Sequence, residues 1–151
     1  VANMMEYIQS LREMVGSQPL ILVGATVIVL NERGELLLQL RSDTKEWGLP
    51  GGSMELGESL VETAARELFE ETGLKAQRYT FIELLSGRDF YFRYPNGDEV
   101  YNVIAVFRAE DVCGEIEAKD RESLDLAYFP LTALPMDLDE RAKIIIEKHC
   151  F

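Results

Sequence analysis

Hydrophobic positions follow helical spacing at both ends of the chain. Before Gly16 an apolar residue recurs every three or four positions, which predicts an amphipathic helix over residues 1–16. The positions concerned are Met4, Ile8, Leu11 and Val15. Residues 139–149 predict a closing helix. The first helix suits packing on the core and contact between two copies of the chain equally well, so a homodimer stays an open alternative.

Between these helices the pattern is typical of strands joined by turns. Residues 20–30 are β-branched and almost wholly apolar, which predicts a strand buried on both faces. Asn96-Gly97 lies between two aromatic or β-branched runs and predicts a hairpin. Further strands are expected at residues 35–41, 81–85, 89–94, 100–107 and 126–129, with an irregular loop at 42–57 and a helix at 59–72. Because strands and helices alternate around an antiparallel hairpin, we expect an α/β fold with a mixed central sheet covered by helices on both faces.

Composition limits the partners that the chain can bind. Its 151 residues, 47% hydrophobic, suit one domain over residues 1–151. With 27 acidic and 15 basic residues the formal net charge is −12, which opposes binding to nucleic acid or an anionic membrane. No apolar run is long enough to span a bilayer and residues 1–16 lack a signal core, so we expect a soluble, cytoplasmic protein. A phosphate-bearing ligand would have to be met by local cations or by a metal.

The helix expected at residues 59–72 is well built at its ends. Ser59 is a plausible N-cap, Glu62 completes a capping box, and Gly73 suits the left-handed position after the last turn. One stripe of the helix is expected to pack on the sheet, and it consists of Val61, Ala64, Ala65, Leu68 and Thr72.

Three acids on the same helix oppose its stability. Glu67, Glu70 and Glu71 are spaced so that their like charges repel. Glu70 and Glu71 also lie in the last turn, where the helix dipole penalises a carboxylate by up to about 1 kcal/mol. Arg66 can offset only part of this charge. The pattern fits either a solvated acidic face or a site for a hard divalent cation such as Mg²⁺, which prefers carboxylate oxygens.

The loop before this helix favours the divalent-cation site over the solvated acidic face. From Gly52 the chain has five residues, Glu58, seven residues, and then Arg66-Glu67-Leu68-Phe69-Glu70-Glu71-Thr72-Gly73-Leu74. Residues 52–74 therefore resemble the complete Nudix box, and residues 47–52 and 128–131 are also similar to that family. The resemblance implies the Nudix α/β/α sandwich. It also implies Mg²⁺-dependent hydrolysis of a nucleoside diphosphate linked to another group, with Mn²⁺ as a substitute cation.

The resemblance also assigns roles to individual residues. Glu70 and Glu71 would bind the metal, Glu67 would bind metal or act as the base, and Arg66 would orient Glu67. Gly51 would offer its backbone carbonyl to the cation. Glu58 would not touch the cation but would hold the residues that surround it. Glu122, on a late loop, would supply a further acid. The expected catalytic residues are Arg66, Glu67, Glu71 and Glu122, and the expected metal ligands are Gly51, Glu67, Glu70, Glu71 and Glu122.

Candidate substrate contacts lie outside the box. Arg41 could bind a phosphate or form a surface ion pair, and Trp47 could stack on a base or anchor its loop. Tyr91 lies 17 positions after Leu74, which is similar to the mark of diadenosine polyphosphate hydrolases. A nucleoside triphosphate or oxidised nucleotide, as in MutT-like members, is the leading substrate. The alternatives are a dinucleoside polyphosphate or nucleotide sugar, and a non-catalytic nucleotide sensor on the same fold.

Overall fold

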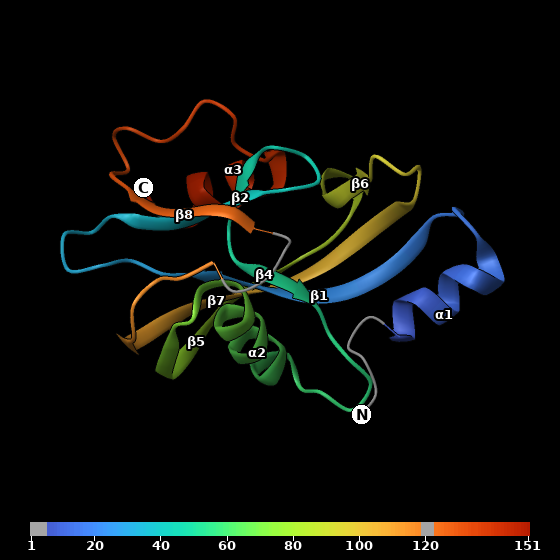
Figure 1. The fold of residues 1–151 in the computed structure, drawn as a ribbon, viewed down its shortest axis with the longest axis horizontal. Helices are drawn as coiled ribbons and strands as arrows, with labels where there is room; N and C mark the ends of the chain where they lie inside the picture. The colour runs from blue at the N-terminus through green and yellow to red at the C-terminus, as the bar shows by residue number, and fades with distance from the viewer. Residues whose placement is uncertain (1–5, 119–122) are drawn as a thin grey trace.

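The computed structural model describes residues 6–118 and 123–151 (Figure 1). Along the chain the helices and strands are α1 (Glu6–Val15), β1 (Leu20–Ile28), β2 (Leu36–Arg41), β3 (Trp47–Gly48), β4 (Gly51–Ser53), α2 (Leu60–Thr72), β5 (Lys75–Leu85), a 3₁₀ turn η1 (Arg88–Phe90), β6 (Tyr91–Arg93), β7 (Glu99–Cys113), β8 (Ser123–Phe129) and α3 (Glu140–His149). No helix within these residues is long and apolar enough to cross a bilayer.

The strands form two hydrogen-bonded sheets. The larger has the order β4-β1-β7-β5, with β6 also paired to β7, and the smaller has the order β3-β2-β8. β1 and β7 run parallel, whereas the other pairs are antiparallel, so the larger sheet is mixed. The expected α/β fold with a mixed sheet and flanking helices is confirmed, with the strands divided over two sheets.

Each face of the larger sheet packs against one helix (Figure 1). Side chains alternate between the faces of a strand, so neighbouring residues of β1 enter different cores. Ala25 and Val27 contact the cluster around Ala64 and Leu68 of α2. Ile28 joins the opposite cluster, which contains Ala142, Ile145 and Ile146 of α3. A strand buried between two helices needs apolar residues on both faces, which explains the unbroken hydrophobic run in this part of the sequence.

Local signals predicted the ends of α2 and the hairpin correctly. The Ser59 hydroxyl accepts the backbone N–H of Glu62, and the Glu62 carboxylate accepts the backbone N–H of Ser59. Gly73 has a φ of 80°, the left-handed conformation expected after the last turn. β6 and β7 pair antiparallel across the turn that contains Asn96-Gly97. These features depend on neighbouring residues only, so the sequence was sufficient to predict them.

Three expectations about exposure and regularity were wrong. Ile21 is 74% exposed, because β1 begins beyond the part of the sheet that α2 covers, beside a shallow hollow lined by α1. Val61 is 46% exposed, since the buried stripe of α2 is shifted around the helix to include Thr63 and Glu71. The loop at residues 42–57 contains the short strands β3 and β4, whose pairing is made by backbone atoms and leaves no pattern of side chains.

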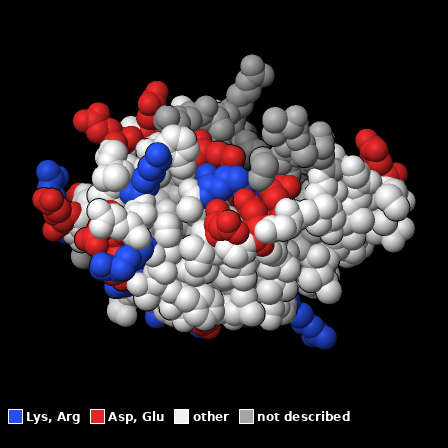
Figure 2. All heavy atoms as spheres, turned by 90° about the horizontal axis from the view of Figure 1, so that it is seen from below, with Lys and Arg blue, Asp and Glu red and all other residues white. Residues whose placement is uncertain are grey.

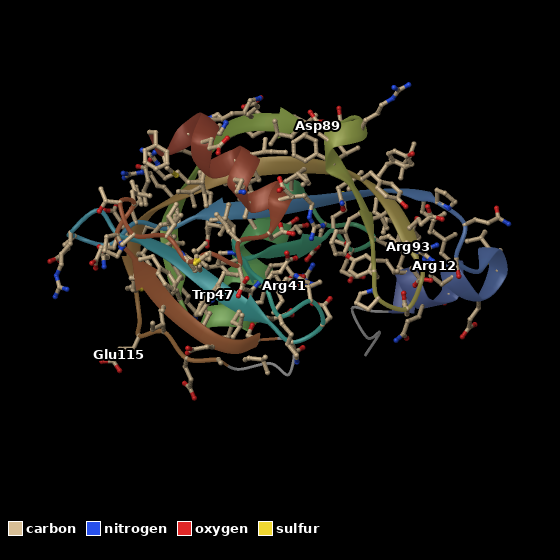
Figure 3. All side chains as sticks on the ribbon, turned by 90° about the horizontal axis from the view of Figure 1, so that it is seen from above. Arg12, Arg41, Trp47, Asp89, Arg93 and Glu115 are labelled. Carbon is tan, nitrogen blue, oxygen red and sulfur yellow. The ribbon has the colours of Figure 1, made fainter. Side chains whose placement is uncertain are left out.

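Arg12 connects α1 to the turn between β6 and β7 through hydrogen bonds and an ion pair. Its guanidinium donates to the carbonyls of Gly16, Gln18 and Glu99 and lies 3.6 Å from the Asp98 carboxylate. In Figure 3, Arg12 and Arg93 are seen together at this end of the molecule. Met4, expected in the apolar stripe of this helix, lies outside the described residues. A dimer contact through α1 stays a prediction.

Candidate active site

The site is built where β4 passes unusually close to β1. A Cβ on Gly24 would lie 2.4 Å from the carbonyl oxygen of Gly52, and a Cβ on Gly51 would lie 2.3 Å from that of Ala25. Real Cβ atoms do not approach so closely, so glycine is needed on both strands. The close pairing places the backbone of Gly51 and Gly52 directly beside α2.

Glu67 of α2 contacts Gly52. A Cβ on Gly52 would meet both carboxylate oxygens of Glu67, at 2.5 and 2.7 Å. The Glu67 side chain is 14% exposed, and its Oε1 accepts a hydrogen bond of 2.7 Å from Nη1 of Arg66. The missing side chain of Gly52 therefore provides the space in which this carboxylate lies.

Arg66 joins the acids of α2 to the preceding loop. Its Nε and Nη2 donate to Glu58 at 2.6 and 3.0 Å, and Nη2 also donates to the Ser53 carbonyl. Nη1 lies 2.7 Å from Glu67 and 3.3 Å from Glu70. Burial disfavours the guanidinium charge, but the bonds to Glu58 and Glu67 raise the pKa of Arg66 above its usual value. Figure 2, seen from the side on which α2 lies, shows acidic atoms gathered around a basic patch.

The same contacts keep Glu58 ionised. Hydrogen bonding from Arg66, opposed by burial, lowers the pKa of Glu58 from 4.5 to about 2. A lowered carboxylate pKa stabilises the folded state above the unfolded value, and this contribution is lost as the pH falls through the folded value. The stability that the pair contributes should therefore disappear between about pH 4.5 and pH 2.

Replacing Arg66 by Met should flatten the acid dependence of stability in that window. Without the guanidinium the pKa of Glu58 returns towards its ordinary value, so folding no longer releases a proton there. Urea unfolding at a series of pH values measures the slope. Arg33→Met is the matched control, because that side chain is 83% exposed and lies 3.8 Å from its partner Glu35. An unchanged slope in Arg66→Met would contradict the assignment.

Glu71 points away from solvent, unlike Glu70. Glu71 is 2% exposed. Its two carboxylate oxygens accept hydrogen bonds from Gln39 Nε2 at 2.9 Å and from the backbone N–H of Gly51 at 2.8 Å. Gln39 is itself 2% exposed and accepts a hydrogen bond of 2.7 Å from the Ser123 hydroxyl. Sequence reasoning missed Gln39 and Ser123. The available signal was a single polar residue, Gln39, inside the apolar strand β2.

The donor chemistry of this cluster suits a hard divalent cation. Carboxylate and carbonyl oxygens are the ligands that Mg²⁺ prefers, and Glu67 and Glu70 both face one positive group, Nη1 of Arg66. In residues 6–118 and 123–151, however, no three Asp, Glu, His or Cys side chains lie close enough together to hold a metal. The Glu71 carboxylate lies between its donors Gln39 and Gly51, and Gly51 also lines the adjacent cavity. Glu122 lies outside the described residues.

A cavity of about 100 Å³ lies beside this cluster and is partly walled by Gly51, Gly52 and Ser53. Polar side chains also line it, namely Arg41, Tyr94, Asn102, Asp139 and Arg141. The Arg141 guanidinium lies 4.2 Å from the centre of the Phe92 ring and 3.4 Å from the Asp139 carboxylate. Each of the two guanidinium groups on this cavity is paired with a carboxylate, Arg141 with Asp139 and Arg41 with Asp43, so they offer N–H donors to a ligand without a net positive charge.

Of the three candidate substrate contacts, Arg41 is among the residues that line the cavity, whereas Trp47 and Tyr91 are not. Arg41 lines the cavity and is held by two hydrogen bonds to Asp43. Trp47 packs edge-on against Phe129, and its backbone N–H and carbonyl form hydrogen bonds with residues 137 and 139. Tyr91 donates to Glu99 and packs on Tyr101, on the hairpin.

Sequence reasoning missed Asp139 and Arg141 as residues of the cavity. Asp139 is the N-cap of α3, and its carboxylate accepts the backbone N–H of Ala142. Arg141 lies in the first turn of that helix, where the dipole disfavours a cation. That unfavourable placement was a usable signal.

Comparisons with known proteins agree with this architecture. The family model described as "NUDIX domain" matches residues 21–148. The crystal structure of a MutT NUDIX hydrolase from Burkholderia pseudomallei superposes with a TM-score of 0.73, at 28% identity, covering 87% of this chain and 98% of that one.

Two curated relatives match over shorter stretches. The human protein named 8-oxo-dGDP phosphatase NUDT18 is 32% identical over 117 residues, which is 74% of this chain and 33% of the relative. A Bacillus subtilis (strain 168) protein with the provisional name 8-oxo-dGTP diphosphatase is 55% identical over 53 residues, or 35% of this chain. The chain thus spans 33% and 36% of the lengths of these two relatives. The family model and the MutT superposition cover most of the chain, which therefore belongs to the Nudix hydrolase family and has the fold of its MutT-like members.

Proposed function

We propose that the chain is a Mg²⁺-dependent pyrophosphohydrolase of nucleoside triphosphates, with an oxidised guanine nucleotide as its leading substrate. Both curated relatives are named for an oxidised guanine nucleotide, the triphosphate 8-oxo-dGTP in one and the diphosphate 8-oxo-dGDP in the other, and the first name supports the triphosphate. The observation that carries the proposal is the position of Gly52, which contacts the Glu67 carboxylate and also lines the cavity. A ligand in the cavity would therefore present its phosphates next to the acids of α2.

In this proposal the cation is held by Glu67, Glu70 and Glu71, with the Gly51 carbonyl as a further ligand. Glu122 stays a predicted ligand from outside the described residues. A divalent cation supplies neutralisation of phosphate charge and lowers the pKa of a bound water. Glu70 is the acid best placed to meet it, because its side chain is 44% exposed and its ion pair with Arg66 is the longest of that guanidinium's three ion pairs among the described residues, at 3.3 Å.

The remaining groups have roles that follow from their contacts. Glu67, beside Gly52, would accept the proton of the attacking water as a new P–O bond forms and the pyrophosphate bond breaks. Arg66 would hold Glu67 in place, and Glu58 would in turn hold Arg66. Arg41 and Arg141 would bind the anionic or carbonyl groups of the nucleotide in the cavity. The products would be a nucleoside monophosphate and pyrophosphate.

The test is turnover of a substrate panel by the purified chain. The panel contains dGTP, 8-oxo-dGTP, diadenosine tetraphosphate, ADP-ribose and a nucleotide sugar, each with Mg²⁺ and with EDTA, and products are resolved by anion-exchange chromatography. We expect the oxidised triphosphate to be cleaved to its monophosphate, and EDTA to stop the reaction. Faster cleavage of the dinucleotide or the sugar nucleotide would replace the substrate assignment. Binding without cleavage of any compound would make the chain a nucleotide sensor.

A further inference from the structure

Gln39 is an unusual residue for its place in the fold. It lies in β2 after Leu36, Leu37 and Leu38, all of which are fully buried, and it is itself 2% exposed. Burying a primary amide costs free energy unless its donors and acceptor are paired. An apolar residue of the same length would fill this position without that cost, so the amide calls for a reason beyond packing.

The partners of Gln39 fix the direction of its amide. An ionised carboxylate can only accept hydrogen bonds, so the NH₂ group must face Glu71, at 2.9 Å. The carbonyl end then faces Ser123, whose hydroxyl donates to it over 2.7 Å. The opposite orientation would set the amide oxygen against the carboxylate. Ser123 therefore anchors the far end of the amide, while the carboxylate sets which end faces Glu71.

Glu71 is in this way held from both sheets. Gln39 belongs to β2 of the smaller sheet and bonds to Oε1, whereas Gly51 belongs to β4 of the larger sheet and bonds to Oε2. Each of the two carboxylate oxygens therefore has a hydrogen-bond donor from a different sheet. The carboxylate of α2 thus has a defined position between the two sheets, next to the strand that lines the cavity.

We propose that Gln39 is a positioning residue for the metal centre: its amide, anchored by Ser123, fixes the carboxylate of Glu71. The inference rests on the proposed function, because it assumes that Glu71 binds the cation. A ligand whose supporting partner is lost binds metal about 10 to 100 times more weakly. Gln39→Met keeps the length of the side chain and removes only the polar end, so it should weaken metal binding without opening a cavity.

The experiment measures binding of Mn²⁺ alone, by electron paramagnetic resonance, with Mg²⁺ competition. Gln39→Met should bind Mn²⁺ about 10 to 100 times more weakly than the wild-type chain, and its kcat should fall while KM changes little. Leu38→Met is the matched control, since it changes the neighbouring buried side chain of the same strand. It should bind Mn²⁺ as tightly as the wild-type chain.

Unchanged Mn²⁺ affinity in Gln39→Met would overturn the proposal, and so would an equal loss in Leu38→Met. If Gln39→Met does not fold, Ser123→Ala takes its place, because it leaves the donor to Glu71 but removes the hydrogen bond that anchors the other end of that amide. Ser123→Ala should then show a smaller loss of Mn²⁺ affinity, and wild-type affinity would again overturn the role. A wild-type chain that binds Mn²⁺ but cleaves no nucleotide would refute the proposed function and leave the role of Gln39 standing.

Discussion

Replacing Glu70 by Gln is expected to abolish Mg²⁺-dependent hydrolysis while leaving the metal-free protein at least as stable as before. Loss of a group that merely supports a metal ligand costs about 10- to 100-fold in activity, so loss of a charged ligand should cost more than about 100-fold. The cation would keep fewer negative partners, and the phosphate charge would be neutralised less well. Steady-state release of the monophosphate over a range of Mg²⁺ concentrations measures the change.

The thermal stability of the same variant, unlike its activity, should not fall. Glu70 lies in the last turn of α2, where removing a carboxylate relieves about 0.3–1 kcal/mol of dipole repulsion. Its helical pair with Arg66 is worth about 0.3–0.5 kcal/mol, and the Gln side chain can still accept that hydrogen bond. Thermal unfolding in EDTA should therefore show a Tm that is unchanged or slightly higher. Mg²⁺ should raise the Tm of the wild-type chain more than that of the variant.

Glu147→Gln is the matched control for both measurements. Glu147 is an exposed acid in the last turn of α3, so its removal relieves the same kind of dipole repulsion. Its Tm should behave like that of Glu70→Gln, whereas its hydrolysis should remain that of the wild-type chain. If Glu70→Gln also kept full hydrolysis, Glu70 would be a solvated acid and not a ligand of the metal.

Glu70 gives a cleaner test than Glu71. Glu71 is buried and accepts hydrogen bonds from Gln39 and Gly51, so the NH₂ group of a Gln at this position would face another donor. A buried donor without an acceptor costs about 1–3 kcal/mol. Lost activity in Glu71→Gln would therefore mix a missing ligand with a disturbed core.

The sequence was sufficient to predict those parts of the site that depend on residues close together in the chain. Ser59, Glu62 and Gly73 fix the ends of α2 through neighbours within a few residues, and the spacing of the acids follows from the helix itself. The burial of Glu71 could not be predicted in this way. It depends on Gln39, which is 32 positions away in the sequence, and on where β2 lies against β4.

Several of the residues that line the cavity could not be predicted from the sequence either, because their positions depend on distant parts of the chain. Spacing after the box singled out Tyr91, but the structure places Tyr94 of the same hairpin in the cavity. Which aromatic of a hairpin lines a cavity depends on the register with β7 and on the packing of α3 against the sheet, and both arise from distant residues. Asp139 and Arg141 likewise enter the cavity only because α3 folds back over the strands.

Replacing Gly52 by Ala is expected to disable the site while sparing the fold. The three atoms nearest to the new Cβ all belong to the Glu67 carboxylate, at 2.5 to 2.7 Å, so that side chain must move. A carboxylate at the end of a flexible side chain can turn aside, which should cost less than the about 1–3 kcal/mol of overpacking a rigid core. Displacing it from Arg66 should lower hydrolysis by about 100-fold, because small misplacements of catalytic groups have effects of that size.

Gly24→Ala provides the contrast, because the obstacle on that strand is backbone. Its Cβ would lie 2.4 Å from the Gly52 carbonyl oxygen and 3.3 Å from the Cα of Ser53, so β1 and β4 would have to separate. Thermal unfolding should therefore show a large fall in Tm for Gly24→Ala and a small one for Gly52→Ala. In a Glu67→Ala background the obstacle to Gly52→Ala is gone, and the second substitution should leave the Tm unchanged. Wild-type hydrolysis by Gly52→Ala would show that the position of the Glu67 carboxylate does not matter, and Glu67 would lose its proposed role as the base.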